Sequence, residues 1–400
     1  MKKPCIFINM HYMALGGAER ALLGLLNSLD TNLVDVDLFL NQHTGEFMPL
    51  IPNDINLLPE LKGYNAIERP MKQILKENQI GVFCGRLIAK WKYKRYFNSL
   101  TEEQKKLDVS EFQYVADSVD SHLRSLHELG VYDLAISFMQ PHNIVLNKVK
   151  AHKKIAWIHT DYSAIHLDVM KEIKIWGGFD YIVSISPDCT KSFINTFPEL
   201  SNKIIEIENI LSPTFVREQA GIIEKTEVGE FKGIKLVSVG RICHAKNYDN
   251  IPYIANRLKQ EGLIFKWFII GPGSHSDIDK TIVETGTEDC IEFLGPKDNP
   301  YPFIRDCDIY VQPSRYEGKS VTVREAQILC RPVVITDYLT AKSQIENEID
   351  GIICPMDNNS VAQAICDLIN DKEKMDKITS YLSSHDYGNE TEVEKIYNLI

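Results

Sequence analysis

The sequence predicts an α/β protein made of two Rossmann-like, doubly wound halves. Apolar, β-rich runs recur along all 400 residues, and segments with helical periodicity separate most of them. Continuous apolar strands that alternate with helices are typical of parallel sheets covered on both faces. The runs are too many for one ordinary doubly wound sheet, and this favours two sheets.

The predicted strands run from one end of the chain to the other. In the first half they are Ile6–Met10, Val34–Leu40, Leu134–Met139, Ile155–His159, Tyr181–Ile185 and Ile204–Ile210. In the second half they are Ile234–Val239, Phe265–Ile270, Ile291–Leu294, Ile309–Gln312, Val333–Thr336 and Gly351–Cys354. Gly17–Leu29 and Ser360–Asn370 are two of the helices predicted between them.

These patterns predict two domains and a tail. The first domain covers residues 1–211 and contains a helical insertion at about 63–129, where no convincing strand occurs. A charged, weakly periodic stretch from Arg217 to Lys232 precedes the strand at Ile234, so the second domain covers residues 212–386. Residues 387–400 have the pattern of a final helix, which could pack back on the first domain.

Composition and charge argue against several classes of protein. A hydrophobic content of 44% is enough for two domain cores, and a net charge of −11 argues against a nucleic-acid binder with a dominant basic face. The nine cysteines are scattered without a C-x-x-C pair, as expected of small buried side chains in a reducing compartment. The sequence has neither a signal peptide pattern nor an apolar stretch of about eighteen residues. We therefore expect a cytoplasmic protein, either free or associated with the inner face of the membrane.

One segment of the insertion, Arg86–Phe97, is both basic and aromatic. Lysine and arginine side chains interleave there with Leu87, Ile88, Trp91, Tyr93 and other apolar residues. Such a helix in an acidic protein could lie on an anionic membrane surface. It could equally be a solvated insertion whose aromatic side chains pack inward.

Two glutamates, Glu317 and Glu325, flank a loop that opens a helix. The order of elements is strand, loop, helix, strand, so the loop lies at the carboxyl end of a strand, where open α/β sheets bind ligands. The helix N-terminus favours an anion, and the carboxylates can accept hydrogen bonds from sugar hydroxyls beside it. A nucleotide sugar carries both groups. The residues at the predicted helix N-terminus are Lys319, Ser320, Val321 and Thr322.

A second group of candidate residues follows the strand Ile234–Val239. Gly240 permits a tight turn, and Arg241 and Lys246 would then point toward the Glu317 loop as a pair suited to a diphosphate. Gly273 belongs to a glycine turn at the end of the next strand, although turn chemistry alone explains this residue. The Asp306-Cys307-Asp308 sequence directly precedes a strand, and we predict no metal site there or elsewhere.

Taken together, these motifs resemble the retaining GT-B glycosyltransferases of family 4. The resemblance covers about residues 234–356, and its hallmark is the two glutamates separated by seven residues. It implies a GT-B fold whose two domains face an interdomain cleft. It also implies that Glu317 contacts the transferred sugar and Glu325 the ribose, while Arg241 and Lys246 hold the diphosphate. Lys319 and Ser320 stand where many members have Phe-Gly, so the donor sugar stays open.

The first half adds three residues to this resemblance. Gly16 and Gly17 open the helix Ala18–Leu29, at the end of a loop that faces the donor phosphate and the acceptor in many such enzymes. A role in helix packing is the alternative for these glycines. His159 ends a strand at a position where the family often has a histidine that reaches the donor sugar.

The resemblance implies transfer of a hexose-type sugar from a nucleoside diphosphate sugar, with a UDP-sugar favoured. The acceptor would be a saccharide or lipid-linked saccharide, as in envelope or capsule polysaccharide assembly, and the anomeric configuration would be retained. Neither cofactor nor metal is implied, because Arg241, Lys246 and the helix N-terminus would stabilise the leaving diphosphate. A GT-B-type sugar-nucleotide epimerase or phosphorylase and a non-catalytic nucleotide-sugar-binding protein are the alternatives.

Overall fold

The computed structural model describes residues 3–14 and 16–400, which form two compact units. The first unit comprises Met1–Met13, Leu29–Glu208 and Thr391–Ile400. The second unit comprises Ala14–Ser28 and Asn209–Glu390. No helix in the described part of the chain is both long enough and apolar enough to cross a lipid bilayer.

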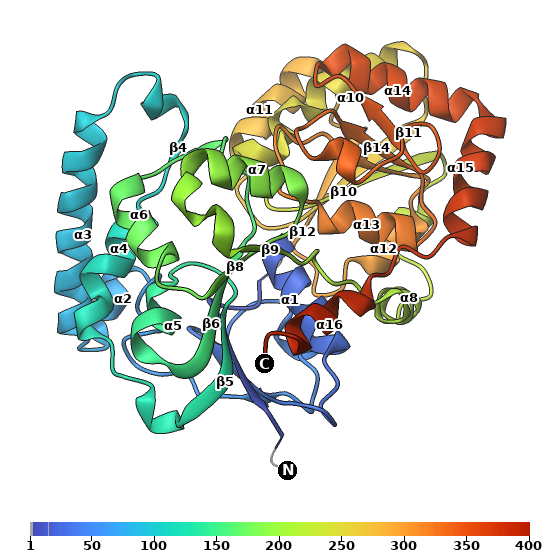
Figure 1. The fold of residues 1–400 in the computed structure, drawn as a ribbon. Coiled ribbons are helices and arrows are strands. Elements are labelled where there is room, and N and C mark those ends of the chain that lie inside the picture. Colours follow the sequence, from blue (N-terminus) through green and yellow to red (C-terminus); the bar gives the residue numbers. More distant parts are fainter. Residues whose placement is uncertain (1–2, 15) are drawn as a thin grey trace. The chain divides into compact units, whose positions relative to one another are not determined.

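The first unit is built on a seven-stranded sheet in which all neighbouring strands are parallel (Figure 1). Its order is β3-β2-β1-β5-β6-β8-β9, so the chain reverses direction across the sheet between β1 and β5. In β1, side chains on both faces are fully buried, as expected for a sheet between two helix layers. The strands are β1 Cys5–Met10, β2 Asp35–Leu40, β3 Asn56–Leu57, β5 Val131–Ser137, β6 Lys150–Ile158, β8 Tyr181–Ser184 and β9 Ile204–Glu206.

Helices cover this sheet, and the insertion contributes several of them. Residues 63–129 hold α2, α3 and α4, together with the two-residue strand β4 (Asp108–Val109), which pairs with β7 (Ile165–His166). Ser186 starts α7 by accepting a hydrogen bond from the backbone N–H of Cys189, and Pro187 follows it at the first helical position. The helices are α2 Met71–Lys76, α3 Ile80–Ser99, α4 Phe112–Val119, α5 Asn143–Lys148, α6 Val169–Trp176, α7 Pro187–Thr196 and α16 Val393–Tyr397.

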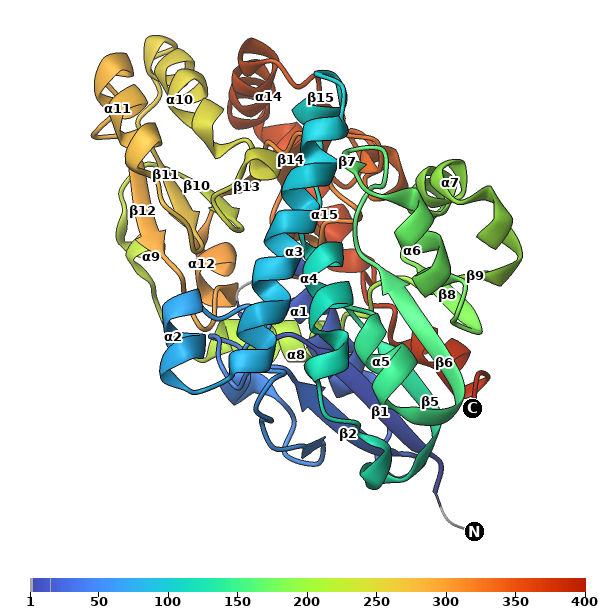
Figure 2. The ribbon, with the colours of Figure 1, turned by 90° about the vertical axis from the view of Figure 1, so that its left-hand side faces the viewer.

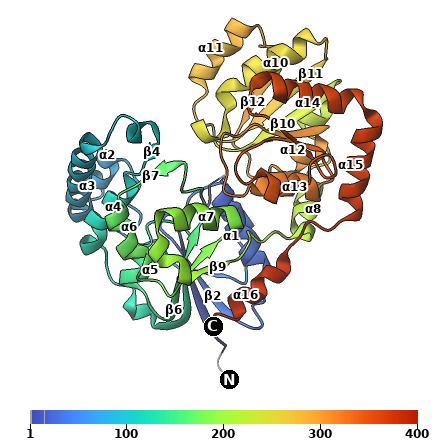
Figure 3. The ribbon, with the colours of Figure 1, turned by 45° about the horizontal axis from the view of Figure 1, so that its top comes forward.

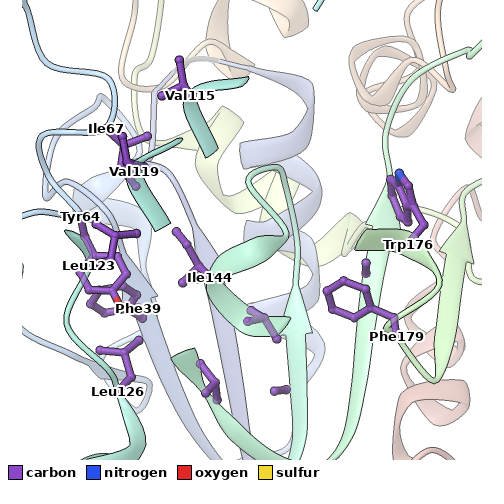
Figure 4. Packing of buried hydrophobic residues seen from close by; sticks show 14 of the residues in the cluster. Phe39, Tyr64, Ile67, Val115, Val119, Leu123, Leu126, Ile144, Trp176 and Phe179 are labelled. Atoms are coloured by element: carbon purple, nitrogen blue, oxygen red, sulfur yellow. The ribbon is translucent and has the colours of Figure 1, made fainter. Parts of the chain in front are cut away.

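The core of the first unit joins the insertion to the sheet (Figure 4). Phe39 of β2 meets the ring of Tyr64 edge-on at 5.0 Å, and Val119 of α4 belongs to the same buried cluster. At the other end of the cluster, Trp176 packs against Phe193 with ring centroids 5.0 Å apart. The insertion is therefore part of the hydrophobic core of this unit.

The second unit contains a six-stranded parallel sheet in the order β12-β11-β10-β13-β14-β15. Helices lie on both of its faces, with α10, α11 and α14 on one side and α8, α12 and α13 on the other (Figure 3). The strands are β10 Ile234–Val239, β11 Phe265–Ile270, β12 Ile291–Gly295, β13 Ile309–Gln312, β14 Val333–Thr336 and β15 Ile352–Cys354. The helices are α1 Gly17–Ser28, α8 Pro213–Gly221, α9 Glu227–Glu230, α10 Ile251–Gln260, α11 Ser276–Thr285, α12 Tyr301–Asp306, α13 Val321–Ile328, α14 Asn358–Asn370 and α15 Lys372–Ser384.

Two segments belong to a unit whose other residues are far from them in the sequence. Helix α1 packs on α13 and belongs to the second unit, whereas the sequence placed it in a domain of residues 1–211. Residues 391–400 belong to the first unit, where the hydroxyl of Tyr397 accepts a hydrogen bond of 2.7 Å from the backbone N–H of Asp30. Lys395 donates to the carbonyl of Glu206 at 3.1 Å in the same region.

Candidate functional site

The second sheet has its switch point between β10 and β13. These strands are neighbours, with Leu236 opposite Ile309, while the chain continues from β10 to β11 on the other side. Ligands of open α/β sheets bind outside the carboxyl ends of the strands at such a point. The loops that follow β10 and β13 therefore form the candidate ligand site of this unit.

Arg315 ties these two loops together. Its backbone N–H donates to the carbonyl of Ala245 at 2.7 Å, and its guanidinium donates to the carbonyl of His244 at 2.7 Å. The same guanidinium makes two bonds to the carboxylate of Asp249, at 2.9 and 2.6 Å. Asn247, with a φ of 61°, adds a bond of 2.8 Å from its side-chain amide to the carbonyl of Pro313. The side chains of Arg315 and Asn247 thereby fix the positions of both loops, and neither residue is among the predicted site residues.

Glu317 is the centre of the polar groups at this point. Its Oε1 accepts three hydrogen bonds, from Lys246 Nζ at 2.6 Å, Gln312 Nε2 at 2.8 Å and Ser314 Oγ at 2.6 Å. Only 13% of the Glu317 side chain is exposed. The structure thus brings together two residues of the predicted site, Lys246 and Glu317, as an ion pair, and adds Gln312 and Ser314.

Gly240 and Arg241 stand at the start of the loop after β10. A Cβ atom at residue 240 would lie 3.0 Å from both Lys246 Cε and the hydroxyl of Tyr248, so a glycine keeps these side chains in place. Arg241 is exposed. Tyr248 is buried, and among the described residues its hydroxyl has no hydrogen-bond partner.

The predicted glycine turn after β11 lies against the same loop. The backbone N–H of Ile242 donates to the carbonyl of Pro272 at 2.8 Å. A Cβ atom at Gly271 would lie 2.0 Å from the carbonyl oxygen of Gly240, and Gly273 has a φ of 130°. Close backbone approach and a positive φ account for both glycines. The structure therefore places Gly273 beside the site without requiring it to touch a ligand.

The N-terminus of α13 is partly occupied by protein groups. The backbone N–H of Ser320 donates to the side chain of Gln344 at 3.2 Å, and Gln344 donates back to the Ser320 carbonyl. Thr322 Oγ1 bonds Gln312 at 3.3 Å. Lys319 is half-buried and Val321 is buried. Of the backbone N–H groups at this helix N-terminus, where the sequence predicts an anion, that of Ser320 thus already has a partner.

Glu325 lies deeper, in the middle of α13, and is fully buried. Its Oε1 accepts a bond of 3.0 Å from the hydroxyl of Tyr301, and its Oε2 accepts one from Arg20 of α1. Burial raises the pKa of the Glu325 carboxyl, while Arg20 and Tyr301 act in the opposite direction. The sequence pattern predicts a ligand-binding role for Glu325 but gives no sign of either partner.

The glycines before α1 differ from each other. Gly17 is the first residue of α1, is exposed and has open space around its Cα. A Cβ atom at Gly16 would collide with the carboxylate of Glu19, and the Gly16 carbonyl accepts a bond of 3.1 Å from the backbone N–H of Arg20. Leu15 of the predicted loop lies outside the described residues.

His159 belongs to the first unit, just after β6. Its ring lies 4.6 Å from that of Phe138 and is nearly parallel to Trp157. Burial lowers the pKa of His159 to about 3, against a weaker opposing contribution from the Phe138 backbone, so the imidazole is neutral. Within the described chain its Nε2 is buried without a hydrogen-bond partner.

No group of three or more His, Cys, Asp or Glu side chains in residues 3–14 and 16–400 is arranged to hold a metal ion. The Asp306 carboxylate instead accepts hydrogen bonds from the backbone and side chain of Thr226 and pairs with Arg305. Asp306 is the last residue of α12, and its carboxylate holds Thr226, the residue that caps α9.

Residues 233–371, which contain both loops of this site, match the family described as Glycosyl transferases group 1. The chain is 24% identical over 276 residues to the amylovoran biosynthesis glycosyltransferase AmsK of Erwinia amylovora, which is 61% of this chain and 68% of that protein. It is 28% identical over 139 residues to an N-acetylgalactosamine-N,N'-diacetylbacillosaminyl-diphospho-undecaprenol 4-alpha-N-acetylgalactosaminyltransferase of Campylobacter jejuni, which is 34% of this chain and 37% of that protein. The alignments with curated relatives span from 27% to 68% of the relatives' own lengths.

Among solved structures, the chain is similar to Anabaena HepE in complex with UDP-glucose. The TM-score is 0.65 at 15% identity, and the comparison covers 98% of each chain. This likeness concerns the fold alone. It confirms the predicted fold class, the GT-B glycosyltransferase fold with two Rossmann-like parallel sheets.

Proposed function

We propose that this chain, whose residues 233–371 form a group 1 glycosyltransferase domain, transfers a hexose-type sugar from a nucleoside diphosphate sugar with retention of configuration. The observation that carries the proposal is the Lys246–Glu317 pair at the switch point of that domain. The UDP-glucose complex of HepE supports a UDP-sugar as donor. The relatives AmsK and the Campylobacter jejuni transferase support a saccharide or lipid-linked saccharide as acceptor.

In this proposal the diphosphate draws Lys246 away from Glu317. The ammonium group would neutralise the charge that grows on the leaving diphosphate, together with the exposed Arg241 and the dipole of α13. The carboxylate of Glu317, still held by Gln312 and Ser314, would then accept hydrogen bonds from hydroxyls of the sugar. This distribution of charge would make a metal ion unnecessary for the leaving group.

The remaining predicted residues take roles around this centre. We propose that Glu325 accepts hydrogen bonds from the ribose, since a carboxylate oxygen has a second lone pair beyond the one bonded to Tyr301 or Arg20. Because Glu325 is fully buried, this role requires the groups that cover it, such as Arg20, to move when the donor binds. His159, as a neutral imidazole, is proposed to contact the donor sugar, and Gly16 and Gly17 to lie beside the donor phosphate.

A set of lysine and glutamate variants tests the function. Lys246→Met should reduce release of UDP from UDP-sugars about 100- to 1,000-fold, the usual loss for one donor that stabilises the leaving charge. Glu317→Gln should also reduce it, because the neutral amide has one acceptor oxygen where the carboxylate has two. Lys259→Met is the matched control, because Lys259 pairs with Asp289 on the surface of the same unit. It should leave the rate unchanged.

Binding gives a second measurement. UDP at a hundred times its Kd should stabilise the wild-type protein by roughly 2.7 kcal/mol in a thermal-shift assay. Unchanged turnover in both site variants would contradict the proposed roles. Absence of a shift with UDP, GDP and ADP alike would contradict nucleotide-sugar binding itself. Release of UDP without any glycosylated product would instead favour the epimerase alternative, and dependence on free phosphate would favour a phosphorylase.

A further inference from the structure

Helix α3 of the first unit presents an apolar stripe to solvent. Ile80 and Trp91 are each 63% exposed, Leu87 is 48% exposed and Ile88 is 47% exposed. These residues recur at steps of seven, one and three, which places them on one face of an α-helix. The exposed Cys84 lies on the same face. A contiguous apolar face on a surface helix is typical of an interaction site.

The opposite face of α3 already holds the helix in place. Val82, Gly85 and Ala89 are buried, and a Cβ atom at Gly85 would lie 2.7 Å from the carbonyl oxygen of Ser118 in α4. Tyr93 and Tyr96 pack on Tyr114 of α4, with ring centroids 6.2 and 5.7 Å apart. The aromatic residues of this segment therefore divide, with the tyrosines inward and Trp91 outward. The exposed stripe is not needed to fix α3 on its unit.

Helix α3 is the outermost helix at its edge of the first unit, as two perpendicular views show (Figures 1 and 2). Helix α2 continues the surface, with Leu75 at 48% exposure between the exposed Lys72 and Lys76. Lys90, Lys94 and Arg95 are exposed beside the stripe on α3. The apolar and basic side chains thus form one surface on α2 and α3.

This surface is strongly positive in an acidic protein. Residues 70–100 hold seven Lys or Arg residues and one Glu, a net charge of +6, whereas the whole chain has −11. The single acid, Glu77, is already paired with Arg69. Two of the basic groups are also engaged, since Lys92 pairs with Asp117 and Arg86 donates to backbone carbonyls. The exposed basic groups at the stripe are therefore without acidic neighbours on α2 and α3.

We propose that α2 and α3 form a docking surface for an anionic lipid bilayer. Ile80, Leu87, Ile88 and Trp91 would enter the boundary between headgroups and acyl chains, and Lys90, Lys94 and Arg95 would contact anionic headgroups. In a symmetric dimer formed through this same face, the second copy would bring the same positive charge to the surface and be repelled. The charge complementarity favours the lipid, and the inference is independent of the proposed sugar transfer.

Co-sedimentation of the full chain with vesicles tests the proposal. The wild type should sediment with vesicles of phosphatidylglycerol and phosphatidylcholine and stay in solution with phosphatidylcholine alone. The apolar variant Leu87→Ser/Ile88→Ser/Trp91→Ser and the charge variant Lys90→Glu/Lys94→Glu/Arg95→Glu should each reduce the bound fraction at least about tenfold, because two kinds of contact act together. All six residues are exposed, so both variants should keep the circular dichroism of the wild type.

Two control variants match these changes elsewhere on the surface. Lys280→Glu/Lys342→Glu/Lys377→Glu reverses three lysines of the second unit whose side chains are 74%, 77% and 73% exposed. Tyr253→Ser/Ile264→Ser/Val283→Ser removes three apolar side chains there that are 46%, 75% and 66% exposed. Both should bind vesicles as the wild type does. Equal loss in the controls would overturn the assignment to α2 and α3.

Tryptophan fluorescence reports the contact directly. Of the four tryptophans, Trp157, Trp176 and Trp267 are at most 3% exposed, so a blue shift on adding anionic vesicles must come from Trp91. No shift and no sedimentation of the wild type would overturn the proposal. Self-association without vesicles that Trp91→Ser abolishes would show that a second copy occupies the surface, and would also overturn it.

Discussion

Lys246 and Glu317 form an ion pair at the switch point of the second sheet, and each is proposed to bind a part of the donor. Three donors converge on one oxygen of Glu317, and two of them, Gln312 and Ser314, come from β13 and its loop. These two donors keep the carboxylate in position if Lys246 turns to an anionic ligand. A side chain that loses its counterion but keeps two hydrogen bonds stays oriented, and an oriented carboxylate can select a hydroxyl by direction.

Tyr248, close to this pair, gives a test of how the site is packed. Its buried hydroxyl has no partner among the described residues, whereas that of Tyr310 donates to Gln312 at 2.7 Å. Tyr248→Phe should therefore leave the free energy of unfolding unchanged or raise it. Tyr310→Phe should lower it by about 1 kcal/mol, the typical value of one hydrogen bond. Chemical denaturation of both variants checks this. Equal losses would show that the Tyr248 hydroxyl is bonded in the folded protein.

The sequence located the residues of the site better than it located their partners. Gly240, Lys246 and Glu317 follow strands, and this local pattern suffices to place them at one edge of a sheet. Partners depend on the tertiary structure. Arg20 is 305 residues from Glu325, and no local pattern predicts that they pair in a buried position. The sequence pattern identifies Gln312 as the last residue of an apolar strand but does not predict its hydrogen bond to Glu317.

The strands show where a local sequence pattern is sufficient to predict the ends of an element. β10, β11, β13 and β14 begin and end at the residues that the sequence predicted, because each is a short, mainly apolar run bounded by turn residues. The expected strand Ile204–Ile210 instead ends at Glu206, since the backbone N–H of Glu208 donates to Glu392 in the C-terminal segment. The strand β3 has only two residues and leaves no periodic signal.

The packing of helix α1 depends on one glycine, Gly24. A Cβ atom at Gly24 would lie 1.7 Å from the carbonyl oxygen of Ile210, and that backbone is held by hydrogen bonds between its neighbours and Asn389. Overpacking by Gly24→Ala should lower the free energy of unfolding by roughly 1–3 kcal/mol. The higher helix propensity of alanine, about 1 kcal/mol, offsets only part of this loss.

Gly17→Ala is the matched control in the same helix, because nothing lies within 4 Å of its Cβ position. This variant should be neutral or slightly stabilising. Thermal melting of the two variants separates a packing effect from a helix-propensity effect. If Gly24→Ala were as stable as the wild type, α1 would not pack on residues 209–211 as the structure shows.

At the scale of the whole molecule, the two units contain different buried titratable groups. In the first unit, burial lowers the pKa of His142 and of His159 to about 3, and burial raises that of Glu172 to about 7. In the second unit, burial raises the pKa of Glu325 and of Asp350. The units should therefore respond differently to acid.

Between pH 6.5 and 5 the unfolded chain binds protons at both histidines while the folded first unit does not, so its free energy of unfolding falls as the pH falls. Each histidine lowers the free energy of unfolding by roughly 1 kcal/mol per pH unit in this range, because the unfolded imidazole is half protonated at pH 6.5 and almost fully protonated at pH 5. Glu172 acts in the opposite sense, because its folded pKa lies above the unfolded value and protonation then favours the folded state. The net loss in the first unit is about 2 kcal/mol over this interval. In the second unit the raised carboxyl pKa values of Glu325 and Asp350 give a small gain instead.

Hydrogen exchange followed by mass spectrometry at pH 7 and pH 5, corrected for the intrinsic pH dependence, measures each unit separately. Protection should fall at pH 5 in peptides from β5 and β6 and stay unchanged or rise in peptides from β10 and β13. Glu172→Gln keeps an acceptor for Trp176 Nε1, which donates to Glu172 at 3.0 Å, and removes the compensating proton. The first unit of this variant should therefore lose more protection at pH 5 than that of the wild type, by about the free energy that Glu172 contributes. Equal acid sensitivity in the two units would mean that His142 and His159 are charged in the folded protein, which their burial opposes.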